Sequence, residues 1–347
     1  MKYSHYVQLL VLILSISISS CDNDDMSPSQ GLNPDSVITA WLDSLGIVAT
    51  VDASGYYYYP DSLNPSGAQV GQAGEVLAVF YNLQDLEGVT IASYQPQDGD
   101  SLLFKYASNA VFPVIFDELV SIMRVGETYN FILPPSLSYN DVASISTSDG
   151  SGIYNLQISL VGILSEGEVL AAELDQIDDY IRVNDLNDTV SVMIDRIDTT
   201  FLNDVILSID TTFSYDIDSV EYFTSGVRYK MLAEGDGPTP INGDLITIDY
   251  RAEFLDGQVF QTRSSFDITI GSSVPNVLIP GFDFGLGLME PGERGLIIIP
   301  SSQAYRESAF VVPAFIIPEL IEDAVIPEYV ELVPPYKSLI FDVTRVN

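Results

Sequence analysis

The chain repeats one ordered set of landmarks, and this repeat limits the folds that it can adopt. Each copy contains a glycine before an alternating strand, an acidic-Gly turn, a Met-x-x-Gly-Glu run and a proline followed by a tyrosine. These landmarks begin at Gly74, Glu87, Met123 and Pro134 in the first half, and at Gly243, Asp256, Met289 and Pro300 in the second. Ordered self-similarity of this kind is typical of duplicated structural units. We therefore predict two related domains in tandem.

Each copy is expected to combine a helix with a sheet. In the second copy, residues 245–250 interleave apolar and polar side chains, and Asp256-Gly257 then joins two strand-like runs, which is the chemistry of a hairpin turn. An amphipathic helix is predicted before each copy, capped by Asp35 in the first half and by a Ser165-x-x-Glu168 capping box in the second. The pattern predicts an α+β fold with a curved antiparallel sheet in each copy.

The second copy carries further landmarks in a specific order. After the strand that ends at Tyr250 come Asp256-Gly257, Phe260, Phe266, Leu278-Ile279-Pro280-Gly281-Phe282, Gly292-Glu293, Ala304-Tyr305, Val333-Pro334-Pro335 and Phe341. This ordered set resembles the FKBP-type peptidyl-prolyl cis-trans isomerases, and it is far more specific than a lone short motif. The resemblance implies two FKBP-like domains, each a curved antiparallel β-sheet wrapped on a short helix and each preceded by an amphipathic helix.

The resemblance implies a reaction that needs no nucleophile and no metal. Rotating a peptide bond costs about 18–20 kcal/mol because the C–N bond has partial double-bond character. A twisted amide is less polar than a planar one, so a dry aromatic pocket binds it better and lowers this barrier. The implied catalytic residues are Tyr250, Phe260, Phe282, Tyr305 and Phe341, and the implied substrate-binding residues are Gln261, Phe266, Leu278, Ile279 and Val333. In the alternative interpretation, these side chains only pack in a core.

The first copy departs from the family where this pocket would lie. Ile91 stands where the second copy has Phe260, Ala92 where it has Gln261, Ile115 where it has Gly281, and Ile158 where it has Phe341. These changes remove aromatic walls. The first copy is therefore predicted to be a structural or binding domain.

The second copy departs from the family at three places. Gln261 replaces an Asp, Arg306 replaces a Gly and would crowd the rim, and residues 306–331 enlarge the loop that overhangs the pocket in this family. We expect this loop to be a lid, a second binding surface or a plug, or else a small subdomain packed on itself or on the first copy. These departures leave open a second function, that of a non-catalytic FKBP-like chaperone or surface-interaction lipoprotein.

The N-terminus reads as an export signal followed by a tether. The apolar run in residues 1–20 is too short to span a bilayer, which is typical of a cleaved signal peptide. Small residues before Cys21 resemble a bacterial lipobox, so Cys21 is predicted to be lipidated; the alternative is a plain secretory signal with an incidental cysteine. Residues 21–34 would form an acidic tether. We expect a lipid-anchored protein on the outer membrane of a Gram-negative envelope, on its periplasmic or its surface-exposed face.

These patterns divide the chain into further segments. We predict a degenerate FKBP-like domain at residues 35–165, a helix with inserted strands at residues 166–224 and an FKBP-type isomerase domain at residues 225–347. Within the middle segment, residues 188–220 alternate apolar and polar side chains, which predicts extra strands.

Composition excludes several classes of function. The 49 acidic and 13 basic residues give a formal net charge of -36, whereas nucleic-acid binding requires a basic face. The single histidine lies in the predicted signal peptide and Cys21 would be blocked by lipid, so the mature chain cannot build a catalytic triad, a Cys-His nucleophile or an ordinary zinc site. We expect no cofactor and no metal. The expected partners are unfolded or proline-containing exported polypeptides and, through Cys21, a membrane; the oligomeric state stays open.

Overall fold

The computed structural model describes residues 33–347, apart from 65–67, 109–110, 140–144, 187–191, 203–204, 216–219, 272–277 and 329–332. The predicted signal peptide, Cys21 and all of the tether before residue 33 lie outside these residues. Among the described residues, no helix combines the length and the apolar character that a membrane span requires.

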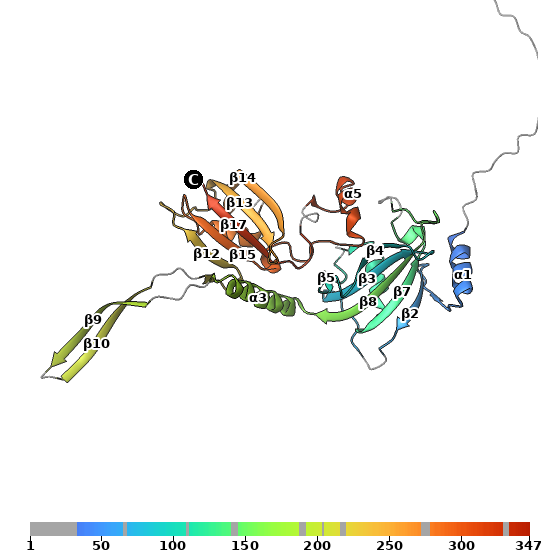
Figure 1. Ribbon diagram of the computed structural model, residues 1–347, viewed down its shortest axis with the longest axis horizontal. Coiled ribbons are helices and arrows are strands. Elements are labelled where there is room, and N and C mark those ends of the chain that lie inside the picture. The colour runs from blue at the N-terminus through green and yellow to red at the C-terminus, as the bar shows by residue number, and fades with distance from the viewer. Residues whose placement is uncertain are drawn as a thin grey trace, which may run out of the picture.

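The first half of the chain forms a helix and an antiparallel sheet, which we call the first unit (Figure 1). The strand order is β1-β2-β7-β8-β3-β4, and β5 also pairs with β3. The strands are β1 (Thr50–Val51), β2 (Tyr57–Ser62), β3 (Val76–Asp85), β4 (Thr90–Tyr94), β5 (Leu102–Lys105), β7 (Glu127–Leu133) and β8 (Tyr154–Leu164). The helices are α1 (Pro34–Leu45) and the short α2 (Phe116–Ser121), and a 3-10 turn, η1, covers Pro135–Leu137.

The second half repeats this arrangement as the second unit. Its strand order is β11-β12-β15-β17-β13-β14, which matches the order of the first sheet position by position. The strands are β11 (Glu221–Tyr222), β12 (Arg228–Ala233), β13 (Leu245–Phe254), β14 (Val259–Thr269), β15 (Arg294–Ile299) and β17 (Leu339–Arg345). The helices are α3 (Glu166–Val183) and α4 (Pro280–Leu286), and a 3-10 turn, η2, covers Ser301–Gln303. The predicted α+β fold with two FKBP-like domains is confirmed.

The helix starts follow ordinary capping chemistry. Before α1, the Asn33 side chain accepts a hydrogen bond from the Asp35 N–H at 3.1 Å, so the cap is Asn33 and the prediction of Asp35 was wrong. Pro34 suits the first helical position because a proline lacks the N–H that would be unsatisfied there. Before α3, the capping box of Ser165 and Glu168 is present as predicted.

Helices α1 and α3 cover the same face of their respective sheets. In α1, Ile38 is fully buried in a cluster with Ile132 of β7. In α3, Ile177 is fully buried in a cluster with Ile298 of β15, the strand that corresponds to β7. Each long helix thus closes one face of a sheet. The short helices α2 and α4 belong to the other core of each unit, where the predicted pocket would lie.

The predicted extra strands are present. Strands β9 (Val192–Leu202) and β10 (Val205–Tyr215) pair with each other as a separate antiparallel ribbon. In the sequence, they follow α3 and precede the strands of the second sheet.

Strand register corrects one of the predicted equivalences between the units. Tyr81 and Leu83 of β3 correspond to Tyr250 and Ala252 of β13. Leu83 lies opposite Leu156, and Ala252 lies opposite Phe341. The counterpart of Phe341 is therefore Leu156, and the prediction of Ile158 was wrong by two residues.

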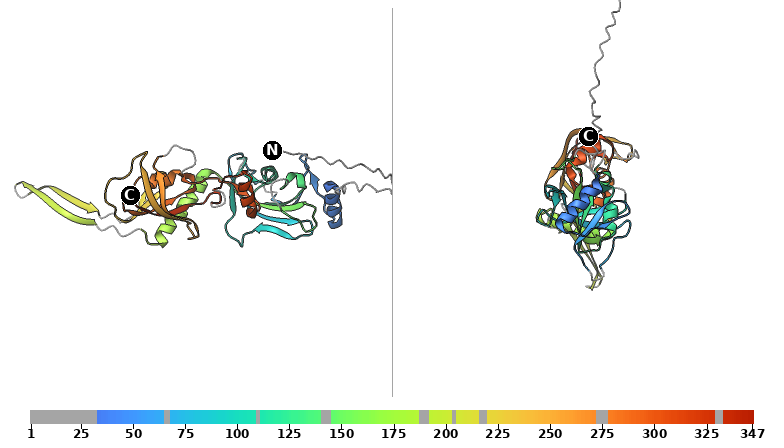
Figure 2. Two further views of the ribbon diagram at one scale, coloured as in Figure 1. Left: turned by 90° about the horizontal axis from the view of Figure 1, so that it is seen from above. Right: turned by 90° about the vertical axis from the view of Figure 1, so that its right-hand side faces the viewer.

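The enlarged loop of the second unit packs on the first unit. It contains β16 (Phe310–Val311), the 3-10 turn η3 (Ala314–Ile316) and α5 (Ile317–Glu322). Strand β16 pairs in parallel with β6 (Val111–Phe112) of the first unit. Figures 1 and 2 show α5, coloured red-brown, beside the blue and green strands of the first unit. Of the alternatives that the sequence left open for this loop, the structure shows packing on the first copy.

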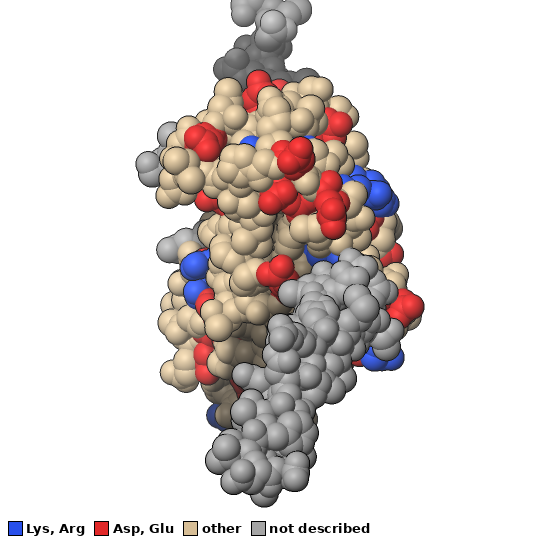
Figure 3. Space-filling view, turned by 90° about the vertical axis from the view of Figure 1, so that its left-hand side faces the viewer, with Lys and Arg blue, Asp and Glu red and all other residues tan. Residues whose placement is uncertain are grey.

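Charge is spread over the surface of the second unit. In the face that Figure 3 shows, Asp and Glu side chains are scattered among Lys and Arg side chains, and the described part of this face has no continuous basic patch. A large net negative charge distributed in this way favours solubility.

Candidate functional site

Three aromatic rings from three elements meet in the core of the second unit. Phe282 of α4 stacks on Phe341 of β17 with ring centroids 4.2 Å apart. The Tyr250 ring of β13 lies 5.6 Å from the Phe282 ring and 5.8 Å from the Phe341 ring, tilted against both. These separations are typical of favourable aromatic pairs. We call these three residues the aromatic cluster.

Strand alternation and two glycines bring the rings together. Along β13, Ile246, Ile248 and Tyr250 are buried at every second position, so the strand directs all three side chains to one face. Helix α4 lies close to β15 because Gly281 and Gly285 have no side chains. A Cβ atom on Gly285 would lie 2.6 Å from side-chain carbons of Ile297, well inside van der Waals contact. The close approach of α4 positions Phe282 against Phe341.

The other predicted site residues surround the cluster. Phe260 meets Phe341 edge to face at 6.4 Å, and Phe266, which is 39% exposed, meets Tyr250 in the same way at 6.1 Å. Val333 is buried in the same core, and three further side chains pack against it while half-buried; they are Leu278, Ile279 and Tyr305. The structure thus brings these predicted residues together around the aromatic cluster.

Gln261, which replaces an Asp of the family, contacts Tyr250. The Tyr250 hydroxyl donates a hydrogen bond to the Gln261 side-chain oxygen at 2.7 Å. Burial raises the pKa of Tyr250, and the nearby Arg263 opposes this rise. The tyrosine is therefore neutral near pH 7. The acceptor that orients its hydroxyl is the neutral amide of Gln261, so no carboxylate lies at this position of the site.

Arg306 lines a cavity that is separate from the aromatic cluster. Its φ of 51° lies in the left-handed region that a glycine adopts without strain. Its backbone N–H donates to Ser301, and its carbonyl accepts from Tyr336, both at 2.9 Å. Its side chain lines a cavity of about 370 Å³ beside α3, and that cavity's lining includes none of the predicted site residues. The structure therefore does not support the expected crowding of the rim by Arg306.

Sequence reasoning missed one aromatic residue at the site. Phe254, at the end of β13, stacks on Phe260 with the ring centroids 4.9 Å apart. Phe254 continues the two-residue alternation of Tyr250 and Ala252, so strand periodicity was the signal that pointed to it.

A larger groove lies between the first unit and the second, beside α3 of the second unit. Its volume is about 740 Å³, and its lining includes the buried polar groups of Glu173, Tyr336 and Ser338. One carboxylate oxygen of Glu173 and both hydroxyls have no hydrogen-bond partner among the described residues. Glu173 was not predicted as a site residue, because a lone acidic residue in an acidic helix gives no signal in the sequence.

Comparisons with known proteins show which family the second unit resembles. The family model for FKBP-type peptidyl-prolyl cis-trans isomerases matches residues 237–345. FK506-binding protein 1 of Candida glabrata is 33% identical over 128 residues, which are 35% of this chain and 93% of that protein.

Two bacterial proteins are also similar to this chain. A probable FKBP-type peptidyl-prolyl cis-trans isomerase FkpA of Neisseria meningitidis is 33% identical over 90 residues, which are 26% of this chain and 33% of that protein. The outer membrane protein MIP of Legionella longbeachae is 32% identical over 81 residues, which are 23% of this chain and 34% of that protein. The matched region thus spans about a third of each bacterial relative. Since nearly the full length of the Candida protein is matched, the chain belongs to the FKBP-type peptidyl-prolyl cis-trans isomerase family.

Proposed function

We propose that the second unit catalyses the cis-trans isomerisation of X-Pro bonds in exported proteins, with the aromatic cluster as its active site. One observation carries this proposal. Tyr250, Phe282 and Phe341 come from three separate elements and face one another in one core, bordered by half-buried Tyr305 and Ile279.

The cluster fits the reaction because the transition state is less polar than the ground state. A twisted amide has lost its resonance, so it leaves water more readily than a planar amide does. Aromatic walls that exclude water therefore bind the twisted form more tightly, which lowers the barrier. In this proposal, the Ile279 backbone N–H and the Tyr305 hydroxyl donate to carbonyls beside the proline. Each such bond contributes about 1 kcal/mol net and mainly fixes orientation.

The enlarged loop is consistent with an accessible site. Its buried apolar residues, from Phe310 to Leu320, belong to the core of the first unit and not to the core that contains the aromatic cluster. At its base, Ser308 donates a hydrogen bond to the Val333 carbonyl at 3.0 Å, which ties the start of the loop to the site.

An envelope location completes the proposal. One similar protein is named an outer membrane protein, and the lipobox-like Cys21 together with the apolar run before it favours a lipid anchor. Exported polypeptides that fold outside the cytoplasm are the substrates that such a location would supply.

A protease-coupled assay on a prolyl tetrapeptide tests the activity. We expect Tyr305→Phe to lower kcat/KM about tenfold, the equivalent of about 1.4 kcal/mol, because a substrate carbonyl loses its donor. We expect Phe282→Leu to lower kcat/KM by a larger factor, because it removes the ring that stacks on Phe341. Phe284→Leu is the matched control, since Phe284 lies on the same helix, is 41% exposed and packs on Phe223.

A wild-type rate equal to the uncatalysed rate would overturn the proposal. If that chain still suppressed the aggregation of a proline-free client, the non-catalytic chaperone would become the better assignment.

A further inference from the structure

The core of the first unit contains a segment that comes from the second unit. We call residues 309–326 the inserted segment. Its side chains Phe310, Val311, Val312, Ile316 and Leu320 are all buried in the same core cluster as those of β3, α2, β7 and β8. Because Phe310 follows Tyr305 closely in sequence, the chain leaves the second unit's site and enters the other unit almost at once.

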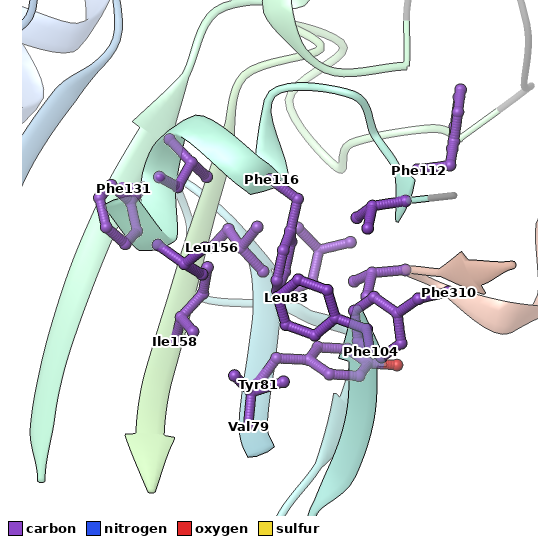
Figure 4. Packing of buried hydrophobic residues seen from close by; sticks show 14 of the residues in the cluster. Val79, Tyr81, Leu83, Phe104, Phe112, Phe116, Phe131, Leu156, Ile158 and Phe310 are labelled. Carbon is purple, nitrogen blue, oxygen red and sulfur yellow. The ribbon is translucent and has the colours of Figure 1, made fainter. Parts of the chain in front are cut away.

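Phe310 occupies the place that corresponds to the aromatic cluster of the second unit. It stacks on Phe104 with ring centroids 5.0 Å apart and meets Phe116 edge to face at 5.3 Å (Figure 4). Phe116 lies on α2 directly after Ile115, the counterpart of Gly281, so it is the counterpart of Phe282. The first unit thus has the aromatic floor of such a site, and a ring of the same chain lies against it.

The backbone of the inserted segment is also held by hydrogen bonds. Strand β16 pairs in parallel with β6, and the Val312 N–H donates to the Phe112 carbonyl at 2.9 Å. The Tyr139 hydroxyl donates to the Val312 carbonyl at 2.7 Å. Tyr139 is the counterpart of Tyr305 in the repeat, and Val312 directly precedes the buried Pro313. The first unit therefore holds the carbonyl before a proline with the tyrosine that occupies the position of Tyr305.

The environment of Tyr139 suits a permanent contact. Its side chain is 3% exposed and meets Tyr154 edge to face at 5.1 Å. Burial raises the pKa of Tyr139 well above its ordinary value, so the hydroxyl stays protonated and remains a donor. Within the inserted segment, all four consecutive residues 310–313 are buried, which is the pattern of a bound peptide and not of a surface loop.

We propose that the first unit is a peptide-binding site that is occupied by its own chain, with Phe310-Val311-Val312-Pro313 as the built-in ligand. The class of ligand that this site takes is an extended apolar peptide with an aromatic residue, two β-branched residues and a proline. Strand pairing with β6 provides the affinity for the backbone, and the ring of Phe310 between Phe104 and Phe116 provides the selectivity. The inserted segment excludes other chains from this site because a tethered ligand has a high effective concentration.

Binding of the ligand in trans tests this proposal. In the test variant, residues 309–326 are replaced by a Gly-Ser linker of the same length, and the probe is a fluorescent synthetic peptide of residues 308–322. We expect the peptide to bind the variant saturably and to show no binding to the wild-type chain, whose site is filled. A peptide that carries Phe310→Ala should bind at least tenfold more weakly, whereas one that carries Phe315→Ala should bind as the original, because Phe315 is 59% exposed.

Two results would overturn the proposal: a folded variant that does not bind the peptide, or equal binding by the wild-type chain. If the variant does not fold alone, the peptide is added during refolding. Recovery of the β-sheet circular dichroism signal would then support a ligand role, and failure to recover it would count against one.

A point variant tests the same contact in the intact chain. Tyr139→Phe removes the donor to the Val312 carbonyl and leaves the ring in place. We expect hydrogen exchange of the Val312 N–H to accelerate about tenfold, since the bond to the Phe112 carbonyl loses its neighbouring support. Tyr129→Phe is the control, because Tyr129 lies on β7 and stacks on Phe131. Unchanged exchange at Val312 in the Tyr139→Phe variant would contradict the assigned role of Tyr139.

Discussion

Gln261 supplies the acceptor for Tyr250 although it carries no charge. We expect Gln261→Leu to destabilise the chain by about 1 kcal/mol, because the hydroxyl of the buried Tyr250 loses its 2.7 Å partner and keeps only its interaction with Arg263. In the isomerase assay, KM should rise, since Gln261 no longer orients the Tyr250 hydroxyl toward the substrate. Urea unfolding and steady-state kinetics measure these two effects. Gln258→Leu is the control, and a Gln261→Leu variant that behaves like it would show that the contact is incidental.

Glu173 connects stability to pH. Burial raises the pKa of its carboxyl, and hydrogen bonds from Ser301 and the charge of Lys337 oppose this rise only in part. The unfolded chain therefore loses this proton at a lower pH than the folded chain does. The protonated side chain contributes fully to stability below the ordinary glutamate pKa of about 4.3, and this contribution is lost as the pH rises through the folded-state pKa.

Replacing this carboxyl with an amide should therefore stabilise the protein at neutral pH. We expect Glu173→Gln to raise the free energy of unfolding at pH 7 and to change it little at pH 4, because the amide stays neutral at both and still accepts from the Ser301 N–H. Urea unfolding at a series of pH values gives the comparison. The matched control is Asp175→Asn, at an exposed position of the same helix. A Glu173→Gln curve parallel to that of the wild type would contradict the assigned linkage.

At the scale of elements, glycine decides how α4 lies on the second sheet. We expect Gly285→Ala to destabilise the second unit by about 1–3 kcal/mol, because its Cβ would overlap the Ile297 side chain and push α4 away from β15. Gly287→Ala, at the end of the same helix, would meet only backbone oxygens at 3.3 Å or more and should change stability little. Chemical denaturation measures both variants, and equal effects would show that α4 adjusts freely.

The sequence predicted this element order well because the signals were local. The alternating strand at residues 245–250, which continues to Phe254 in the structure, the turn at Asp256-Gly257 and the capping box before α3 each depend on a few adjacent residues. The error at Ile158 had a different origin. A slip of two residues along a strand keeps every side chain on the same face, so alternation alone cannot detect it. Pairing between β3 and β8 also shifts at Ala78 and Val79, which further obscures the equivalence.

The position of the inserted segment could not be predicted from the sequence, for a related reason. Its contacts join Phe310 to Phe104 and Val312 to Tyr139, which lie far apart along the chain. An apolar run such as 310–317 predicts burial without indicating which core receives it. The residues of the candidate site, in contrast, could be named from the sequence because the family landmarks assign them one by one.

At the scale of the whole molecule, the inserted segment makes the stability of the first unit depend on residues of the second. The sole tryptophan, Trp41, reports on the first unit because it lies on α1 and donates to the Leu86 carbonyl at 2.6 Å. We expect Phe310→Ala to lower the free energy of the unfolding transition seen by Trp41 fluorescence by about 3–5 kcal/mol, as for other buried phenylalanines.

The matched control for this coupling is Phe315→Ala in the same segment. Phe315 is largely exposed, so its replacement should shift the Trp41 transition by less than about 0.5 kcal/mol. A Phe310→Ala variant that left the Trp41 transition in place would mean that the first unit folds without the inserted segment. Because Phe310 and Trp41 belong to different halves of the chain, a shift in this transition can arise only through contact between the two units.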